Sequence, residues 1–161
     1  DMILIDETGL KLCKIQAKIF ESSINKTECS SAVFVRRFML SDIARRMDDG
    51  VFLFESCEED EVFVEIETQY GKSNYGKEKI SAEELYWIGY IYRYWCYTYQ
   101  ITSKQAFKIV KMKELRDLYY PYHSLDPSQA IERILEAKGK LENDLTQRGV
   151  EILRSIINNK K

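Results

Sequence analysis

The 161-residue chain has few residues that interrupt regular structure, with two prolines and seven glycines. That scarcity disfavours a fold of many short strands and favours long helices. It also has no run of about 18 uncharged apolar residues of the kind that spans a bilayer, because its most apolar stretch, 85–101, carries Arg93 in the middle. The net charge of −2 gives no general attraction to nucleic acid or anionic lipid.

The sequence lacks the usual cysteine and histidine signatures of metal sites. It has one histidine and four cysteines (Cys13, Cys29, Cys57 and Cys96), and the cysteines form no CxxC pair and fit no zinc spacing. An N-terminal signal-peptide pattern is also missing, so we expect reduced thiols in a cytoplasmic protein. We therefore predict no metal and no cofactor.

Apolar residues recur at helical spacing in most segments of the chain. The predicted fold class is all-α: a single-domain bundle of about six to eight helices over 1–161, with a helix-turn-helix-like C-terminal half. Its core covers about 7–138, and 139–161 is expected to form a helical arm. The expected helices are 7–24, 31–48, 56–70, 82–99, 103–110, 113–120, one that begins at Pro127, and 140–157.

Several helix boundaries are indicated by local signals. Three capping boxes, in which Ser or Thr precedes Glu or Gln by three residues, are Ser56/Glu59, Ser81/Glu84 and Thr102/Gln105. Asp126 before Pro127 is a further start signal. Ser41 could restart a helix inside 31–48, alternation at Val62, Val64 and Ile66 keeps a strand open for 56–70, and Pro121 is expected to end the preceding helix.

The expected central helix, 82–99, carries eight aromatic residues within fourteen positions and one basic residue, Arg93. At helical spacing Arg93 shares a face with Tyr86, Tyr90 and Tyr97. Arginine among tyrosine rings recognises carboxylates and phosphates, and both residue types are enriched at interface hot spots. The alternative is an internal salt bridge, for example to the acidic helix 58–67.

Acidic residues are concentrated between 47 and 71, where nine of them occur without a basic residue. Glu58, Glu59 and Glu61 lie in the expected first helical turn. Such a block is typical of a solvated face, but it can also mimic phosphate or cover a basic active site of a partner. We therefore predict partner-binding residues in both groups: Glu58, Glu59, Glu61, Tyr86, Tyr90, Arg93 and Tyr97.

A second function class is DNA binding through 103–120, where basic residues outnumber acidic ones. The candidates are Lys104, Lys108, Lys111, Lys113 and Arg116. Major-groove readers usually place Arg, Asn or Gln at the start of the recognition helix, whereas Met112 and Lys113 stand there. Phosphate contacts alone would be non-specific, so nucleic-acid binding is kept as the alternative and not favoured.

A third class is an enzyme or small-molecule binder centred on Arg93 and the tyrosine-rich helix. His123 has Ser124 and Asp126 close by in the sequence, but neighbours in one turn do not by themselves provide the geometry of a catalytic triad. The stretch 71–77 has the spacing of a phosphate-binding loop, yet Glu78 stands where that loop needs Ser or Thr. We predict no catalytic residue and no enzymatic activity.

Three blocks carry a resemblance to a known family: ELYWIGYIYRYWCYTY at 84–99, YYPYHSLDP at 119–127 and AIERI at 130–134. They resemble an uncharacterised family of small bacterial proteins encoded beside toxin–antitoxin-like genes, whose partner is similar to an ADP-ribosyltransferase. The resemblance covers roughly 30–137. It implies an antitoxin or accessory regulator that neutralises a partner, and it transfers no catalytic residue.

The leading hypothesis is therefore a non-catalytic, cytoplasmic protein-binding module that acts on a protein partner, with a toxin encoded nearby as the candidate. A homodimer through the arm stays open. No membrane association is expected.

Overall fold

Eight helices make up most of residues 2–50 and 57–159, the part of the chain that this computed structural model describes, apart from the side chains of 140–144. The predicted all-α class is confirmed, and these residues contain no strand. The helices are α1 (Glu7–Lys26), α2 (Ser31–Met39), α3 (Asp42–Asp48), α4 (Glu59–Tyr70), α5 (Ala82–Tyr99), α6 (Ser103–Ile109), α7 (Met112–Tyr122) and α8 (Pro127–Asn159). They divide into two compact units, Asp1–Ser124 with α1 to α7, and Leu125–Lys161 with α8.

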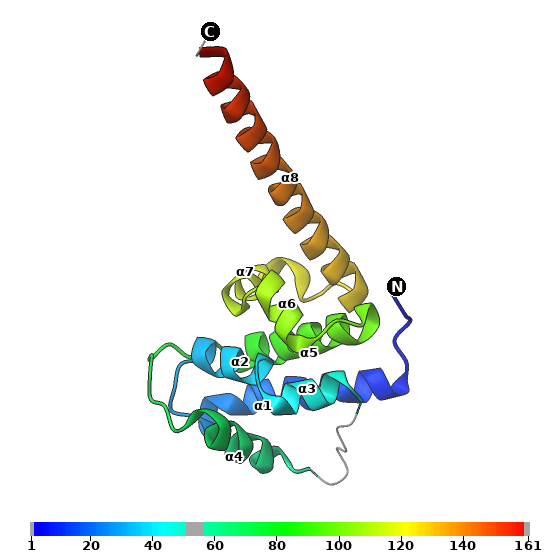
Figure 1. Cartoon of the computed structure of the whole chain (residues 1–161). Coiled ribbons are helices and arrows are strands. Elements are labelled where there is room, and N and C mark those ends of the chain that lie inside the picture. The colour runs from blue at the N-terminus through cyan, green and yellow to red at the C-terminus, as the bar shows by residue number, and fades with distance from the viewer. Residues whose placement is uncertain (1, 51–56, 160–161) are drawn as a thin grey trace. The chain divides into compact units, whose positions relative to one another are not determined.

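The core of the first unit is built on α1 and α5, which pack along one another (Figure 1). Gly89 of α5 permits this close approach. A Cβ atom at that position would lie 2.8 Å from the Phe20 ring, 2.9 Å from the Gln16 carbonyl oxygen and 3.0 Å from Ala17 Cα. The one glycine inside the aromatic helix therefore sets the distance between the two central helices.

Phenylalanine rings connect α1 with α2 and α4. Phe20 makes edge-to-face contacts with Phe34 and Phe38, at 5.8 and 5.1 Å between ring centroids. Phe63 of α4 lies 5.5 Å from Phe34. The segment around Phe63 is helical, so the alternative of a strand there is wrong: α4 buries one helical stripe against these rings.

Local capping accounts for most helix starts. Ser30 and Ser41 accept hydrogen bonds from the backbone N–H groups of Val33 and Ala44, so the segment 31–48 forms two helices. The capping boxes predicted at Ser81 and Thr102 are both present. The one predicted at Ser56 lies outside the described residues.

The predicted end at Pro121 is wrong, because Pro121 lies inside α7. A proline within a helix lacks an N–H donor, and its ring crowds the carbonyl four residues earlier, but Pro121 occupies the last turn of α7, where few helical hydrogen bonds remain to be disturbed. The helical pattern continues past it, since the His123 N–H donates to the Tyr119 carbonyl over 2.8 Å.

The second unit contains one continuous helix, α8, where two helices were expected. Asp126 caps its start by accepting a hydrogen bond of 2.9 Å from the Ser128 N–H. Gly139 and Gly149 lie within it, and each costs about 1 kcal/mol relative to alanine, which does not break the helix. Its last turns expose large apolar side chains at Leu145, Val150, Ile152, Leu153, Ile156 and Ile157. No described helix has the length and apolar content to cross a membrane.

Candidate functional site

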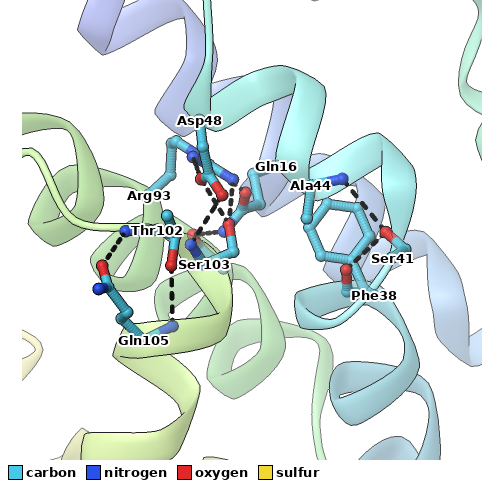
Figure 2. Close-up of polar contacts among 10 residues, drawn as sticks. Gln16, Phe38, Ser41, Ala44, Asp48, Arg93, Thr102, Ser103 and Gln105 are labelled. Carbon is cyan, nitrogen blue, oxygen red and sulfur yellow. Dashed lines mark hydrogen bonds and ion pairs between the residues drawn. The ribbon is translucent and has the colours of Figure 1, made fainter.

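Arg93 lies in the interior of the first unit, where its side chain is only 2% exposed. Its Nε donates to Gln16 Oε1 over 2.8 Å, its Nη1 to Asp48 Oδ1 over 2.6 Å, and its Nη2 to Ser103 Oγ over 2.8 Å (Figure 2). Each nitrogen of the guanidinium group therefore has a partner within the fold.

The partners of Arg93 are themselves hydrogen-bonded. Asp48 accepts from the backbone N–H and the hydroxyl of Ser103, at 2.8 and 2.7 Å. The Gln16 amide donates to the Gly89 carbonyl over 2.9 Å. Among the described residues, no buried side-chain nitrogen or oxygen lacks a hydrogen-bond partner. This closed network connects α1, α3, α5 and α6, which is a structural role.

The prediction that Arg93 contacts a partner protein is corrected by this burial. Arg93 instead forms the internal salt bridge that was the alternative expected from the sequence. Its acidic partner is Asp48, at the end of α3, and not a residue of 58–67. A charge this deep in the fold needs an opposite charge and further hydrogen bonds, and Asp48 and Ser103 supply both. Arg93 is therefore not one of the residues that can contact a partner at the surface.

Tyr97 is half-buried and bonded to the N-terminal segment. Its hydroxyl donates to Asp6 Oδ1 over 2.7 Å, while Asp6 also accepts from the Gly9 N–H to cap α1. The hydrogen bond from Tyr97, followed by that from Gly9, lowers the pKa of Asp6. The same bond and partial burial raise the pKa of Tyr97 to about 12.

Tyr86 and Tyr90, the other two predicted tyrosines, border an open hollow on the surface of the first unit. Their rings stack with 6.4 Å between centroids. The hollow has a volume of about 440 Å³ and is lined by Glu21, Glu83, Tyr86, Trp87, Tyr90, Tyr119 and His123. We call it the aromatic hollow.

His123 closes one side of the aromatic hollow at the end of α7. Its Nδ1 lies 2.8 Å from the Tyr119 carbonyl oxygen, so this nitrogen carries the proton and donates. Its ring stacks on the Tyr119 ring at 4.5 Å between centroids. The histidine is therefore held by the backbone and by the Tyr119 ring.

The predicted acidic residues surround the start of α4. Glu58 is its N-cap residue and is exposed, as is Glu61, whereas Glu59 is half-buried. Glu59 lines a second hollow of about 320 Å³, the α1–α4 hollow, together with Lys14, Ile15, Lys18, Ile19, Cys57 and Val62. The acidic turn therefore borders the surface of α1.

Lys18 of α1 links the two groups of predicted residues. It forms an ion pair of 2.8 Å with Glu21, which lines the aromatic hollow. The hydrogen bond and charge of Glu21 raise the pKa of Lys18, and Glu59 and Tyr86 add smaller electrostatic contributions. The acidic turn of α4 and the tyrosines of α5 thus lie on either side of one helix.

The sequence reasoning missed five residues of this surface: Lys18, Glu21, Trp87, Tyr119 and His123 as a lining group. Two signals were available. Lys18 and Glu21 have the i,i+3 spacing of a helical ion pair, and Tyr119 and His123 have the i,i+4 spacing that stacks two rings on one helical face. Their location beside Tyr86 depends on how α1, α5 and α7 pack.

The basic residues proposed for DNA binding lie on α6, α7 and the short connection between them. Lys104, Lys108, Lys111 and Lys113 are exposed. Arg116 is engaged in ion pairs with Glu78 and Glu84, so its charge is already compensated. DNA binding by this segment stays a prediction.

Comparisons with protein families, curated proteins and solved structures find no match for this chain.

Proposed function

We propose that this chain is a non-catalytic protein-binding module, an antitoxin or accessory regulator that neutralises a partner protein. The observation that carries the proposal is the surface around α1, where the Lys18–Glu21 pair separates the α1–α4 hollow from the aromatic hollow. Tyrosine and tryptophan beside acidic side chains are typical of interfaces that bind a basic partner. We call this surface the α1 face.

The charge distribution supports a partner with a basic surface. Nine acidic residues and no basic one occur in 47–71, and the first turn of α4 contains Glu59, Asp60 and Glu61. Of these, Asp60 is paired with Lys26 at 2.7 Å. Clustered surface charge increases the rate at which an oppositely charged protein binds, and salt reduces that increase. We therefore expect the association to slow as ionic strength rises.

The test is co-expression of the full chain with the product of the adjacent gene, followed by size-exclusion chromatography. The variant replaces Glu58, Glu59 and Glu61 with lysine. The matched control makes the same three replacements at exposed Glu132, Glu136 and Glu151 of α8. Thermal unfolding of both variants verifies that they fold, since acidic residues also stabilise the first turn of a helix.

The proposal predicts co-elution that the α4 variant loses and the α8 control keeps. Separate elution of the two unmodified proteins would contradict it. In that event the DNA alternative would be measured next as salt-sensitive binding to the chain's own promoter, and the Lys108→Glu and Lys111→Glu variants would lose that binding. Co-elution unaffected by the α4 variant would place the interface elsewhere.

A further inference from the structure

The lining of the aromatic hollow combines aromatic faces with negative charge. Four of its seven residues are tyrosine or tryptophan, two are glutamates, and neither lysine nor arginine contributes to the lining. Aromatic faces attract cations through the ring quadrupole, most strongly for tryptophan. Nearby carboxylates reinforce that attraction, so the composition favours a positively charged ligand over a neutral or anionic one.

The rings of the aromatic hollow hold one another in position. Trp87 meets Tyr119 edge to face at 5.8 Å between ring centroids, and Tyr119 stacks on His123 at 4.5 Å. Tyr90 stacks on Tyr86 on one side and on Tyr94 on the other, at 6.4 and 6.3 Å. A ligand would therefore meet rings that are already ordered, which reduces the entropy lost on binding.

The two glutamates of the hollow differ in whether a nearby basic residue already pairs with them. Glu83 is exposed in the first turn of α5, whereas Glu21 is bonded to Lys18. The Lys18 side chain is 61% exposed and does not line the hollow. An incoming cation can therefore share Glu21 with Lys18, and Lys18 opposes it by like-charge repulsion.

We propose that the aromatic hollow binds the guanidinium group of an arginine side chain that the partner protein presents. Guanidinium is planar, stacks on aromatic faces and donates to carboxylates in a fixed geometry. Lys18 lines the α1–α4 hollow together with Glu59 and is paired with Glu21 of the aromatic hollow, so a basic segment of the partner would contact both. This inference rests on the proposed function, because it names the group of the partner that the α1 face recognises.

The binding experiment uses the full chain labelled with ¹⁵N and two small probes. Nα-acetyl-arginine methylamide carries the guanidinium, and Nα-acetyl-citrulline methylamide is its uncharged isostere. The indole N–H signal of Trp87 reports on the hollow. That of Trp95, on the same helix but 4% exposed, is the internal reference. We expect a saturable shift of the Trp87 signal with the arginine probe only.

Three variants distinguish cation recognition from general stickiness. Glu21→Gln together with Glu83→Gln is expected to weaken binding of the arginine probe roughly three- to tenfold, because the two negative charges that line the hollow are lost. Lys18→Met removes the competing cation and is expected to tighten binding about two- to fivefold. Glu132→Gln together with Glu136→Gln, at two exposed positions of α8, changes the net charge by the same two units as the double glutamate variant and is expected to leave binding unchanged.

Equal shifts with the arginine and citrulline probes would overturn the inference, as would an unmoved Trp87 signal or a Lys18→Met variant that binds more weakly. Failure here is separable from failure of the proposed function. Co-elution of the partner without probe binding would keep the binding module and reject the arginine site. Probe binding without co-elution would support a guanidinium site in the aromatic hollow and contradict the proposed function as an antitoxin.

Discussion

Asp48 and Arg93 are 45 residues apart in the sequence and form an ion pair of 2.6 Å whose side chains are 5% and 2% exposed. A buried pair of this kind contributes little net stability compared with apolar residues of the same shape, but removing one partner leaves an uncompensated charge. The pair therefore specifies how α3 and α5 are aligned. Because Asp48 also receives the Ser103 N–H and hydroxyl, it fixes the start of α6 as well.

Arg93→Met is expected to lower the free energy of unfolding by about 3–5 kcal/mol, because Asp48 then remains buried without a positive charge. The control is Arg46→Met. Its ion pair with Glu65 has a similar nitrogen–oxygen distance, 2.7 Å, but the two side chains are 39% and 47% exposed. The expected loss of unfolding free energy is therefore under about 1 kcal/mol. Urea unfolding followed by circular dichroism measures both, and similar losses would contradict the structural role assigned to Arg93.

Two glycines in helices are expected to respond in opposite directions to alanine. Gly89→Ala places a Cβ within 3.0 Å of α1, and such overpacking costs roughly 1–3 kcal/mol. Gly149→Ala meets nothing within 4 Å, so it gains about 1 kcal/mol of helix propensity. Thermal unfolding reports the first change and amide hydrogen exchange along α8 reports the second. Faster exchange around residue 149 in the alanine variant would contradict this assignment.

Helix starts could be predicted from the sequence because their determinants lie within three or four residues. Ser41, Ser81 and Thr102 each accept a hydrogen bond from the backbone three positions later, and that relationship is visible in the chain itself. The continuity of α8 was not predicted, since two helices were expected on either side of Gly139. The structure shows one helix because a single glycine costs only about 1 kcal/mol, which is too little to end it.

The partner of Arg93 could not be predicted, because its contacts lie 10, 45 and 77 residues away. Charge density indicated the acidic helix 58–67, yet burial of arginine requires a matched set of acceptors, and only packing creates one. The same reason applies to the aromatic hollow. Tyr86 and Tyr90 were predicted as surface residues, whereas Glu21 and His123 reach them only through the packing of α1 and α7 against α5.

The hydrogen bond from Tyr97 to Asp6 makes the stability of the fold depend on pH in both the acidic and the alkaline range. The folded-state pKa of Asp6 is lowered. Its contribution to the stability of the fold is therefore present above the unfolded-state pKa of about 3.9 and is lost as the pH falls through the folded-state pKa. The pKa of Tyr97 is raised to about 12, so its contribution is present below about 10 and is lost as pH rises through 12.

Tyr97→Phe is therefore expected to raise the pKa of Asp6 toward its ordinary value, though not fully, because the Gly9 N–H still donates to it. The measurement is an NMR titration of aspartate carboxyl carbons. Asp126 is the internal control, since hydrogen bonds from Ser128 lower its pKa independently of Tyr97. An Asp6 titration that does not move in the variant would show that this hydrogen bond does not form in solution.

The four thiols are expected to differ widely in reactivity. Burial raises the pKa of both Cys13 and Cys96 to about 12, against an opposing effect of the Arg93 charge. At pH 8 only about one such thiol in 10⁴ is then ionised, and the thiolate is the reactive form. Cys29 is also buried, whereas Cys57 is partly exposed. Cys57 should therefore be alkylated first.

Iodoacetamide labelling at pH 8, followed by peptide mass spectrometry, measures the four rates. In the native protein Cys57 is expected to react fastest, although burial and nearby Glu61 raise its pKa as well. In urea all four thiols should react at similar rates, which shows that folding and not sequence protects them. Labelling of Cys13 or Cys96 as fast as Cys57 would mean that the α1–α5 interior opens readily, because these two thiols lie on the helices that Gly89 brings together.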